Sequence, residues 1–164
     1  MLLYVPGEKD PIEDLYDRYA TMLYRLALSM MKNNEDAEDV VQSVFEKYVL
    51  RPHLFFTQEH EKAWMLRVTI NACKDALRRR TMRQAASLDD VAEVGIWDSH
   101  SEVLDVLEKL PEEYRVPLTL YYFEECKIEE IARALQIGVS AAKMRLKRGR
   151  EMMKKELEGG ENRV

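Results

Sequence analysis

The side chains best suited to chemistry are cations crowded onto one short segment near the C-terminus of this 164-residue chain. Residues 140–150 read SAAKMRLKRGR. Ser140 is a good helix N-cap, and Ala142 and Leu146 stand four residues apart, as on the buried side of a helix. A short basic helix suits the major groove of DNA, because cations hold phosphates while other side chains read base edges. Its cations are Lys143, Arg145, Lys147, Arg148 and Arg150.

A partner helix is expected immediately before this basic segment. Apolar residues recur at helical spacing at Ile128, Ile131, Ala132 and Leu135. Gly138 is expected to take a positive φ in the turn between the two helices. Together the segments predict a helix-turn-helix. The alternative is an amphipathic hairpin whose cationic face is only solvated, because most runs of charge are solvated surface faces. The crowding of cations onto one helix favours DNA binding over this alternative.

A second basic element is predicted on a helix over about residues 61–80. Its buried stripe is expected to hold Ala63, Leu66, Ile70, Cys73 and Leu77. About 100° around the helix lies a polar stripe of Arg67, Asn71, Lys74 and Arg78. The same edge carries Trp64 and ends near Arg79. Cations hold phosphates, an amide can read a base edge, and an aromatic ring can stack on an unpaired base. The stripe therefore favours nucleic-acid binding. For Trp64 alone a core position is the favoured interpretation.

The charge distribution agrees with two basic patches on an acidic body. The whole chain carries −5, residues 62–83 carry +6 and residues 133–155 carry +7, which leaves −18 for the rest. No apolar run approaches the roughly 18 residues needed to cross a bilayer, and the N-terminus lacks the features of a secretory signal. Two cysteines far apart in sequence predict no disulfide framework, and the cytoplasm is the expected compartment.

Hydrophobic periodicity predicts an all-α protein. Helices are expected over residues 11–31, about 35–50, about 61–80, 102–110, 112–123 and 128–135, followed by the basic helix. Periodicity weakens over residues 81–101, and the tail after Leu157 is expected to fray. The sequence therefore predicts two small helical domains at 10–82 and 101–157, joined by a flexible linker at 83–100, with the helix-turn-helix in the C-terminal domain.

Four blocks in this order resemble the extracytoplasmic-function group (group 4) of bacterial RNA polymerase sigma factors. They are NNEDAEDVVQSVFEKYV (33–49), AWMLRVTINACKDALRRR (63–80), LEKLPEEYRVPLTLYYFE (107–124) and IEEIARALQIGVSAAKMRLKRGR (128–150). The resemblance covers most of the chain. It implies that the first domain is sigma domain two and the second is sigma domain four.

The resemblance also implies a role for each surface. The helix over 36–49 would dock on core RNA polymerase, with candidate contacts at Asp36, Asp39, Gln42 and Glu46. The −10 promoter element would meet Trp64, Arg67, Asn71, Lys74, Arg78 and Arg79, with the loop near residues 54–61 cradling a flipped base. The −35 element would meet Ser140, Ala141, Lys143, Met144, Arg145, Lys147, Arg148 and Arg150. The implied partners are core RNA polymerase, promoter DNA and an anti-sigma protein, without membrane insertion.

Departures from the family fall in the helix-turn-helix. Gln136 stands where the family usually has glycine, so Gly138 is expected to carry the turn instead. Ala142 and Met144 are unusual in the recognition helix, so the −35 sequence is not inferred.

No catalytic or cofactor site is expected. His53, His60 and His100 lie in stretches expected to be loops, and no CxxC accompanies them, so neither an enzyme nor a metal site is predicted. Cys73 is expected to be a small buried hydrophobe, and Cys126 is expected to be exposed in a turn. The competing function is an independent helix-turn-helix transcriptional regulator, which would bind duplex DNA alone.

The expected linker suggests a conformational change. About twenty flexible residues have an r.m.s. span near 25 Å and a maximum near 70 Å. The two domains could pack together when free and separate on the polymerase, and closure is expected to hide the basic faces. Limited proteolysis is expected to cut first between Ala85 and Ser99.

Overall fold

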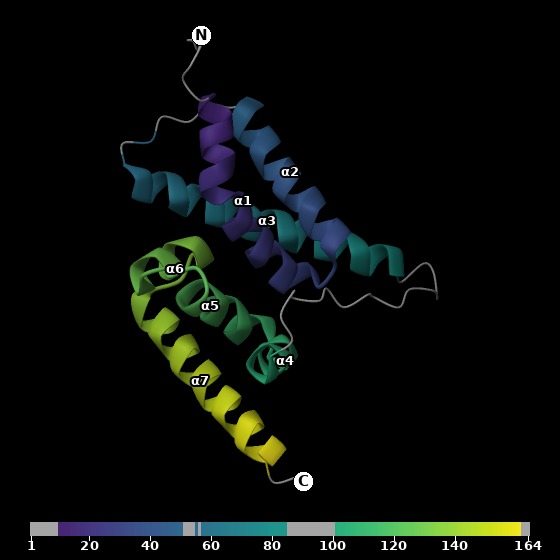
Figure 1. Ribbon diagram of the computed structural model, residues 1–164, viewed down its shortest axis with the longest axis vertical. Helices are drawn as coiled ribbons and strands as arrows, with labels where there is room; N and C mark the ends of the chain where they lie inside the picture. The colour runs from purple at the N-terminus through teal and green to yellow at the C-terminus, as the bar shows by residue number, and fades with distance from the viewer. Residues whose placement is uncertain (1–9, 51–54, 56, 85–100, 162–164) are drawn as a thin grey trace.

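A computed structural model of the chain describes residues 10–50, 55, 57–84 and 101–161, and over these residues it contains seven α-helices and no strand. Helices α1 (Pro11–Met31), α2 (Asn34–Leu50) and α3 (Gln58–Gln84) form the first lobe. Helices α4 (Glu102–Lys109), α5 (Glu112–Tyr122), α6 (Ile128–Leu135) and α7 (Val139–Glu161) form the second. Figure 1 shows the lobes stacked end to end, with α7 running down to the C-terminus. The predicted all-α, two-lobe fold is confirmed.

The first lobe is a three-helix bundle with well-defined helix ends. The Asp10 carboxylate caps α1 by accepting a hydrogen bond from the Ile12 amide at 2.8 Å, and Lys32 ends this helix in the left-handed conformation. Asn33 caps α2 by accepting from the Asp36 amide at 3.0 Å. The core between the three helices is built from fully buried apolar side chains that include Leu23, Leu26, Val44, Leu66 and Ile70.

The second lobe depends on a close approach of α5 and α7. Gly149 is buried in α7, and a Cβ atom built on it would lie 2.8 Å from Leu118 Cδ1 and 3.4 Å from Tyr114 Cβ. A larger residue would therefore push these helices apart. Leu146 and Ala142, about one and two turns earlier, are buried on the same side, as their spacing predicts.

Two helices are longer than the sequence predicts. Helix α3 begins at Gln58 rather than near residue 61, because the Thr57 hydroxyl accepts a hydrogen bond from the His60 amide at 3.2 Å. His60 therefore lies in a helix and not in a loop. Helix α7 continues to Glu161, past Leu157, after which the chain was expected to fray, and the Lys154–Glu158 pair at 3.9 Å supports its last turns. The predicted linker and cleavage region over residues 85–100 lies outside the described residues.

The turn of the helix-turn-helix also differs from the prediction. Gln136, not Gly138, adopts the left-handed conformation, with φ of 56°. The Ile137 amide donates to the Ala132 carbonyl at 3.0 Å and the Gln136 amide donates to the Arg133 carbonyl at 3.2 Å, which is the Schellman arrangement. Gly138 instead caps α7, because its carbonyl accepts from the Ala142 amide at 3.0 Å. Ser140, predicted as the cap, lies inside the first turn.

Candidate nucleic-acid interface

The cationic face of α7 points away from the second lobe. Six of the predicted contact residues are exposed on the outward side, because Ala142, Leu146 and Gly149 turn the opposite side inward. The six are Ser140, Ala141, Lys143, Met144, Lys147 and Arg148. Arg145 is half-buried at one edge of this face. Arg150 is exposed at the other edge, and its guanidinium donates to the Tyr122 hydroxyl at 3.4 Å.

The predicted polar stripe on α3 is exposed along its whole length. Arg67, Asn71, Lys74 and Arg78 lie within about 60° of one another around the helix. Arg78 pairs with Asp75 at 3.4 Å, and both side chains are largely exposed. Arg79 is also exposed but lies about 100° from Arg78, off the stripe. Four groups that can bind phosphate or a base edge thus share one narrow face.

Trp64 lies in an aromatic cluster of the first lobe. It is partly buried, and its ring centroid is 5.9 Å from those of both Tyr48 and Phe55. The favoured interpretation of Trp64 as a packing residue fits this position. Of the loop expected near residues 54–61, the structure describes Phe55 and the residues from Thr57 onward, and the latter already belong largely to α3.

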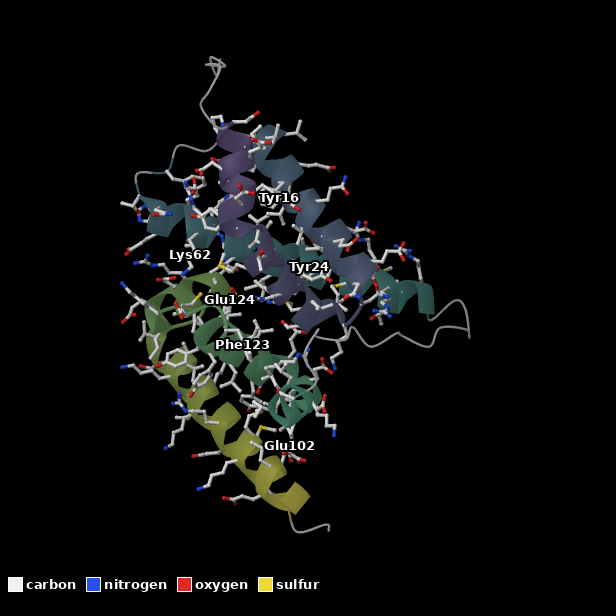
Figure 2. The ribbon with its side chains drawn as sticks, viewed as in Figure 1. Tyr16, Tyr24, Lys62, Glu102, Phe123 and Glu124 are labelled. Atoms are coloured by element: carbon white, nitrogen blue, oxygen red, sulfur yellow. The ribbon has the colours of Figure 1, made fainter. Side chains whose placement is uncertain are left out.

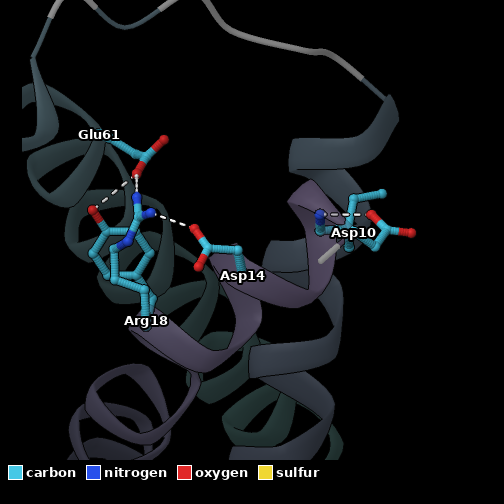
Figure 3. A network of polar contacts seen from close by, with 6 residues as sticks. Asp10, Asp14, Arg18 and Glu61 are labelled. Carbon is cyan, nitrogen blue, oxygen red and sulfur yellow. Dashed lines mark hydrogen bonds and ion pairs between the residues drawn. The ribbon is translucent and has the colours of Figure 1, made fainter. Parts of the chain in front are cut away.

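A polar network fixes the start of α3 against α1. The Glu61 carboxylate accepts hydrogen bonds from Arg18 at 2.9 Å and from the Tyr19 hydroxyl at 3.0 Å, and Arg18 also pairs with Asp14 (Figure 3). Burial, reinforced by the hydrogen bond to Glu61, raises the pKa of Tyr19 to about 12. The network orients α3 and so sets the direction in which its polar stripe points.

The predicted polymerase contacts on α2 border an apolar groove. Asp39, Gln42 and Glu46 are exposed and lie within about 60° around the helix, whereas Asp36 is half-buried and faces Arg80 at 3.8 Å. Gln42 and Glu46 also line a groove of about 980 Å³ between α1 and α2. Its other lining residues include Tyr16, Phe45, Val49 and Leu50, of which Leu50 is 80% exposed.

Several structural residues escaped the sequence analysis. Arg115 is buried in α5, where its guanidinium donates to the carbonyl oxygens of Ser29 at 2.8 Å and Leu110 at 2.7 Å. Burial lowers its pKa below that of a free guanidinium. No periodicity distinguishes Arg115 from an exposed cation. A glycine inside a long helical pattern, by contrast, is a usable sign of close packing, and Gly149 could have been found this way.

Cys126 is buried, which corrects the expectation of an exposed turn residue. Its amide donates to the Leu120 carbonyl at 2.9 Å, and only 2% of its surface is accessible. Burial raises the pKa of the Cys126 thiol to about 11 and that of Cys73 to about 12, so both thiols stay protonated at neutral pH. Over the residues that the structure describes, no group of His, Cys, Asp and Glu side chains could hold a metal ion.

The two lobes pack against each other, but the predicted basic faces stay accessible. Helices α5 and α6 cover α1 and α3 of the first lobe. The second lobe covers a side of α3 other than its polar stripe. The first lobe likewise covers a side of the second lobe other than the outward face of α7. The expectation that closure hides the basic faces is therefore wrong.

No helix formed by the described residues is long and apolar enough to cross a membrane.

Comparisons with known proteins agree with this geometry. Residues 15–94 match sigma-70 region 2, and residues 100–153 match sigma-70 region 4. The extracytoplasmic-function sigma factor SigW of Bacillus subtilis is 29% identical, over 92% of this chain and 91% of its own length. SigM of the same organism is 29% identical, over 87% of this chain and 93% of its own length.

Two solved structures share the fold. RpoE in complex with the anti-sigma factor NepR from Bartonella quintana superposes with a TM-score of 0.77 at 20% identity, covering 89% of this chain and 96% of RpoE. CnrH in complex with the cytosolic domain of CnrY gives a TM-score of 0.64 at 22% identity, over 93% of this chain and 91% of CnrH. With sigma-70 region 2 in the first lobe and region 4 in the second, the chain belongs to the extracytoplasmic-function group of RNA polymerase sigma factors.

Proposed function

We propose that the chain acts in the cytoplasm as a dissociable, non-enzymatic specificity subunit that joins core RNA polymerase and directs transcription initiation by contacting the −10 and −35 elements. The observation that carries this proposal is the pair of exposed cationic helix faces, one in each lobe, on a chain that is otherwise strongly acidic. Cations grouped in this way hold DNA phosphates, while the acidic remainder limits binding of the free chain to non-specific DNA.

The outward face of α7 is proposed to read the −35 element. Lys143, Lys147 and Arg148 would contact phosphates, and Ser140, Ala141 and Met144 would approach base edges in the major groove. Arg145 and Arg150, at the two edges of the face, would contact the flanking backbone. Side chains in the first turn of a recognition helix are the ones that reach deepest into the groove.

The α3 stripe is proposed to meet the −10 element. Arg67, Lys74 and Arg78 would hold backbone phosphates, Asn71 would face a base edge, and Arg79 would contact the adjacent backbone. Trp64 would act mainly by packing, since its ring lies among Tyr48 and Phe55. The domain division at 10–82, 83–100 and 101–157 follows the same assignment, with α3 itself running to Gln84.

Helix α2 is proposed to dock on core polymerase. Asp39, Gln42 and Glu46 offer an acidic edge beside exposed apolar side chains in the α1–α2 groove, and Asp36 lies at its end. A polar edge beside an apolar centre is typical of a protein interface. An anti-sigma protein is proposed as a second partner, because RpoE is bound to the anti-sigma factor NepR in one similar structure and CnrH is bound to the cytosolic domain of CnrY in the other.

Promoter-specific run-off transcription tests the proposal. Core polymerase supplemented with the chain should give a discrete transcript from a promoter selected out of a random-sequence library, whereas core polymerase or the chain alone should not. A template with its −35 segment scrambled is the control. Nanomolar, sequence-specific binding of duplex DNA by the isolated chain at physiological salt would contradict this proposal and favour an independent regulator.

A further inference from the structure

An exposed methionine stands in the middle of the outward face of α7. Met144 is 47% exposed, although the opposite side of its helix is buried against the second lobe. That buried side is formed by Ala142, Leu146 and Gly149, and Met144 lies about 170° around the helix from its middle. Figure 2 shows nitrogen-tipped side chains projecting from α7 on the side away from α4 and α5. Met144 therefore points in the direction of the cations and away from the core.

The neighbours of Met144 on this face are polar. Ser140 lies one turn before it, Lys147 and Arg148 lie about one turn after it, and all three are exposed. A large apolar side chain enclosed by cations suits a partner that is anionic at its rims and carries apolar groups between them. The major groove of DNA has this character, because phosphates line both rims and each thymine presents a 5-methyl group on the floor.

The position of Met144 along α7 also suits contact with a base. Helix α7 begins at Val139, so Met144 lies in the second turn, about 7.5 Å along the axis from the start. Side chains near the N-terminus of a recognition helix are the ones that contact base edges. Met144 is long and flexible enough to follow the groove floor, because an unbranched methionine has three rotatable bonds.

The chemistry of methionine limits which base Met144 can select. Its thioether is only a weak acceptor, so it cannot form the paired hydrogen bonds by which arginine or lysine selects guanine and asparagine or glutamine selects adenine. The discrimination open to Met144 is apolar contact. In the major groove, the apolar group that distinguishes one base from the others is the 5-methyl group of thymine.

We propose that Met144 is a specificity-determining residue, which selects thymine at one position of the −35 element by packing against the 5-methyl group of that base. The inference rests on the proposed function, because it requires α7 to lie in the major groove. Lys147 and Arg148 would hold the phosphates on either side and so fix the register of Met144 over the base. Ser140 can hydrogen-bond to any base edge and would add affinity with little discrimination.

Deoxyuridine tests the proposal, because it pairs as thymidine does and lacks only the 5-methyl group. Each thymine in the −35 segment of a promoter that the holoenzyme transcribes is replaced in turn, and binding of the holoenzyme is measured. At one position the replacement should weaken binding about fourfold, which is the effect expected for one buried methyl group. A −35 segment that tolerates every replacement without loss would overturn the proposal.

Met144→Ala should remove this discrimination. The variant should bind the thymine and deoxyuridine promoters with equal affinity, whereas Met144→Leu, which keeps an apolar side chain, should retain a preference for thymine. Met82→Ala is the matched control, because Met82 is 70% exposed on α3 and the same atoms are removed in the other lobe. This control should keep the fourfold ratio of the parent. The same ratio in Met144→Ala would show that another residue reads the methyl group.

A methyl group on a different base provides a second readout. Cytosine in place of the selected thymine changes the hydrogen-bonding pattern, and 5-methylcytosine restores the methyl group at the same place in the groove. The parent holoenzyme should bind the 5-methylcytosine promoter about fourfold more tightly than the cytosine promoter, and Met144→Ala should bind both equally. Transcription that survives scrambling of the −35 segment would refute the proposed function of α7. Transcription that depends on this segment but ignores both methyl groups would refute only the role of Met144.

Discussion

At the scale of single residues, location separates the cations that DNA can reach from those that hold the fold together. Lys143 and Arg67 are exposed on their helix faces, whereas Arg115 is buried and bound to two backbone carbonyls. Arg80 is drawn toward Asp36 at 3.8 Å and the Met31 carbonyl at 3.4 Å. Cations that look alike in the sequence therefore differ in whether DNA can reach them.

Lys143→Ala should reduce the salt dependence of promoter binding by the holoenzyme. Loss of one phosphate contact lowers the slope of log K against log salt by about 0.9. The measurement is a salt titration on a promoter that the holoenzyme transcribes. Lys155→Ala is the control, because Lys155 is exposed on the same helix beyond the proposed contact segment; equal slopes for all three proteins would refute the role of Lys143.

Tyr19 should make folding of the first lobe sensitive to alkaline pH. Its pKa is about 12 in the folded chain and lies near 10 in an unfolded chain, so its contribution to stability is complete below pH 10 and is lost as pH rises toward 12. Ultraviolet titration of the parent minus Tyr19→Phe should show a tyrosinate forming near pH 12. A difference spectrum centred on pH 10 would show that the burial of the Tyr19 hydroxyl and its hydrogen bond to Glu61 do not hold in solution.

At the scale of elements, the turn between α6 and α7 carries a local strain. Gln136 is held at φ 56°, a conformation that costs a residue with a Cβ about 1 kcal/mol or more. Gln136→Gly should therefore raise the free energy of unfolding by about 1 kcal/mol, measured by denaturant titration. Gly138→Ala is the contrasting change, since Gly138 is not left-handed and has open space around it, and it should bring no comparable gain.

Gly149 should be the least replaceable glycine of α7. Gly149→Val should lower the free energy of unfolding by about 1–3 kcal/mol, because the added methyl groups meet Leu118 and Tyr114. Gly159→Val changes the same residue type in the same helix where nothing lies within 4 Å, so it should be near neutral. Equal thermal stability of the two variants would mean that α5 and α7 can separate without cost.

The sequence was sufficient for the number, order and buried faces of these elements, because apolar periodicity records which side of a helix meets the core. It was less informative at their ends: α3 and α7 extend past every expected stop, since caps such as Thr57 and pairs such as Lys154–Glu158 act through geometry. Arg115 and Cys126 could not be placed, because what buries them comes from a lobe distant in sequence. The roles of the predicted DNA and polymerase contacts remain predictions.

At the scale of the whole molecule, the two proposed DNA-binding faces lie on separate lobes that pack against each other. The lobes are joined by polar links that water can replace, such as Lys62–Glu130 and Arg115 on the Ser29 carbonyl. Because buried apolar side chains of both lobes also belong to one continuous core, separating the lobes on core polymerase would cost apolar burial as well as the difference between the hydrated and the paired charges. Specificity would then depend on assembly, because neither lobe alone covers both elements.

The burial of Cys126 gives the protein a native probe of this motion. Lys62, on the opposite lobe, lies beside the thiol, so parting of the lobes should wet its sulfur, whereas Cys73 is fully buried on the inner side of α3 and is expected to be exposed mainly by unfolding of the first lobe. In a Cys73→Ser background, an aromatic disulfide reagent should modify Cys126 about tenfold faster in Lys62→Glu than in the parent, with no dye attached. In a Cys126→Ser background, Cys73 reports unfolding of the first lobe. The rate of its modification should be the same with Lys62→Glu as without it. The two thiols thus report two separate equilibria, which are separation of the lobes at Cys126 and unfolding of the first lobe at Cys73. Equal acceleration of the modification at both thiols would mean that the two events occur together.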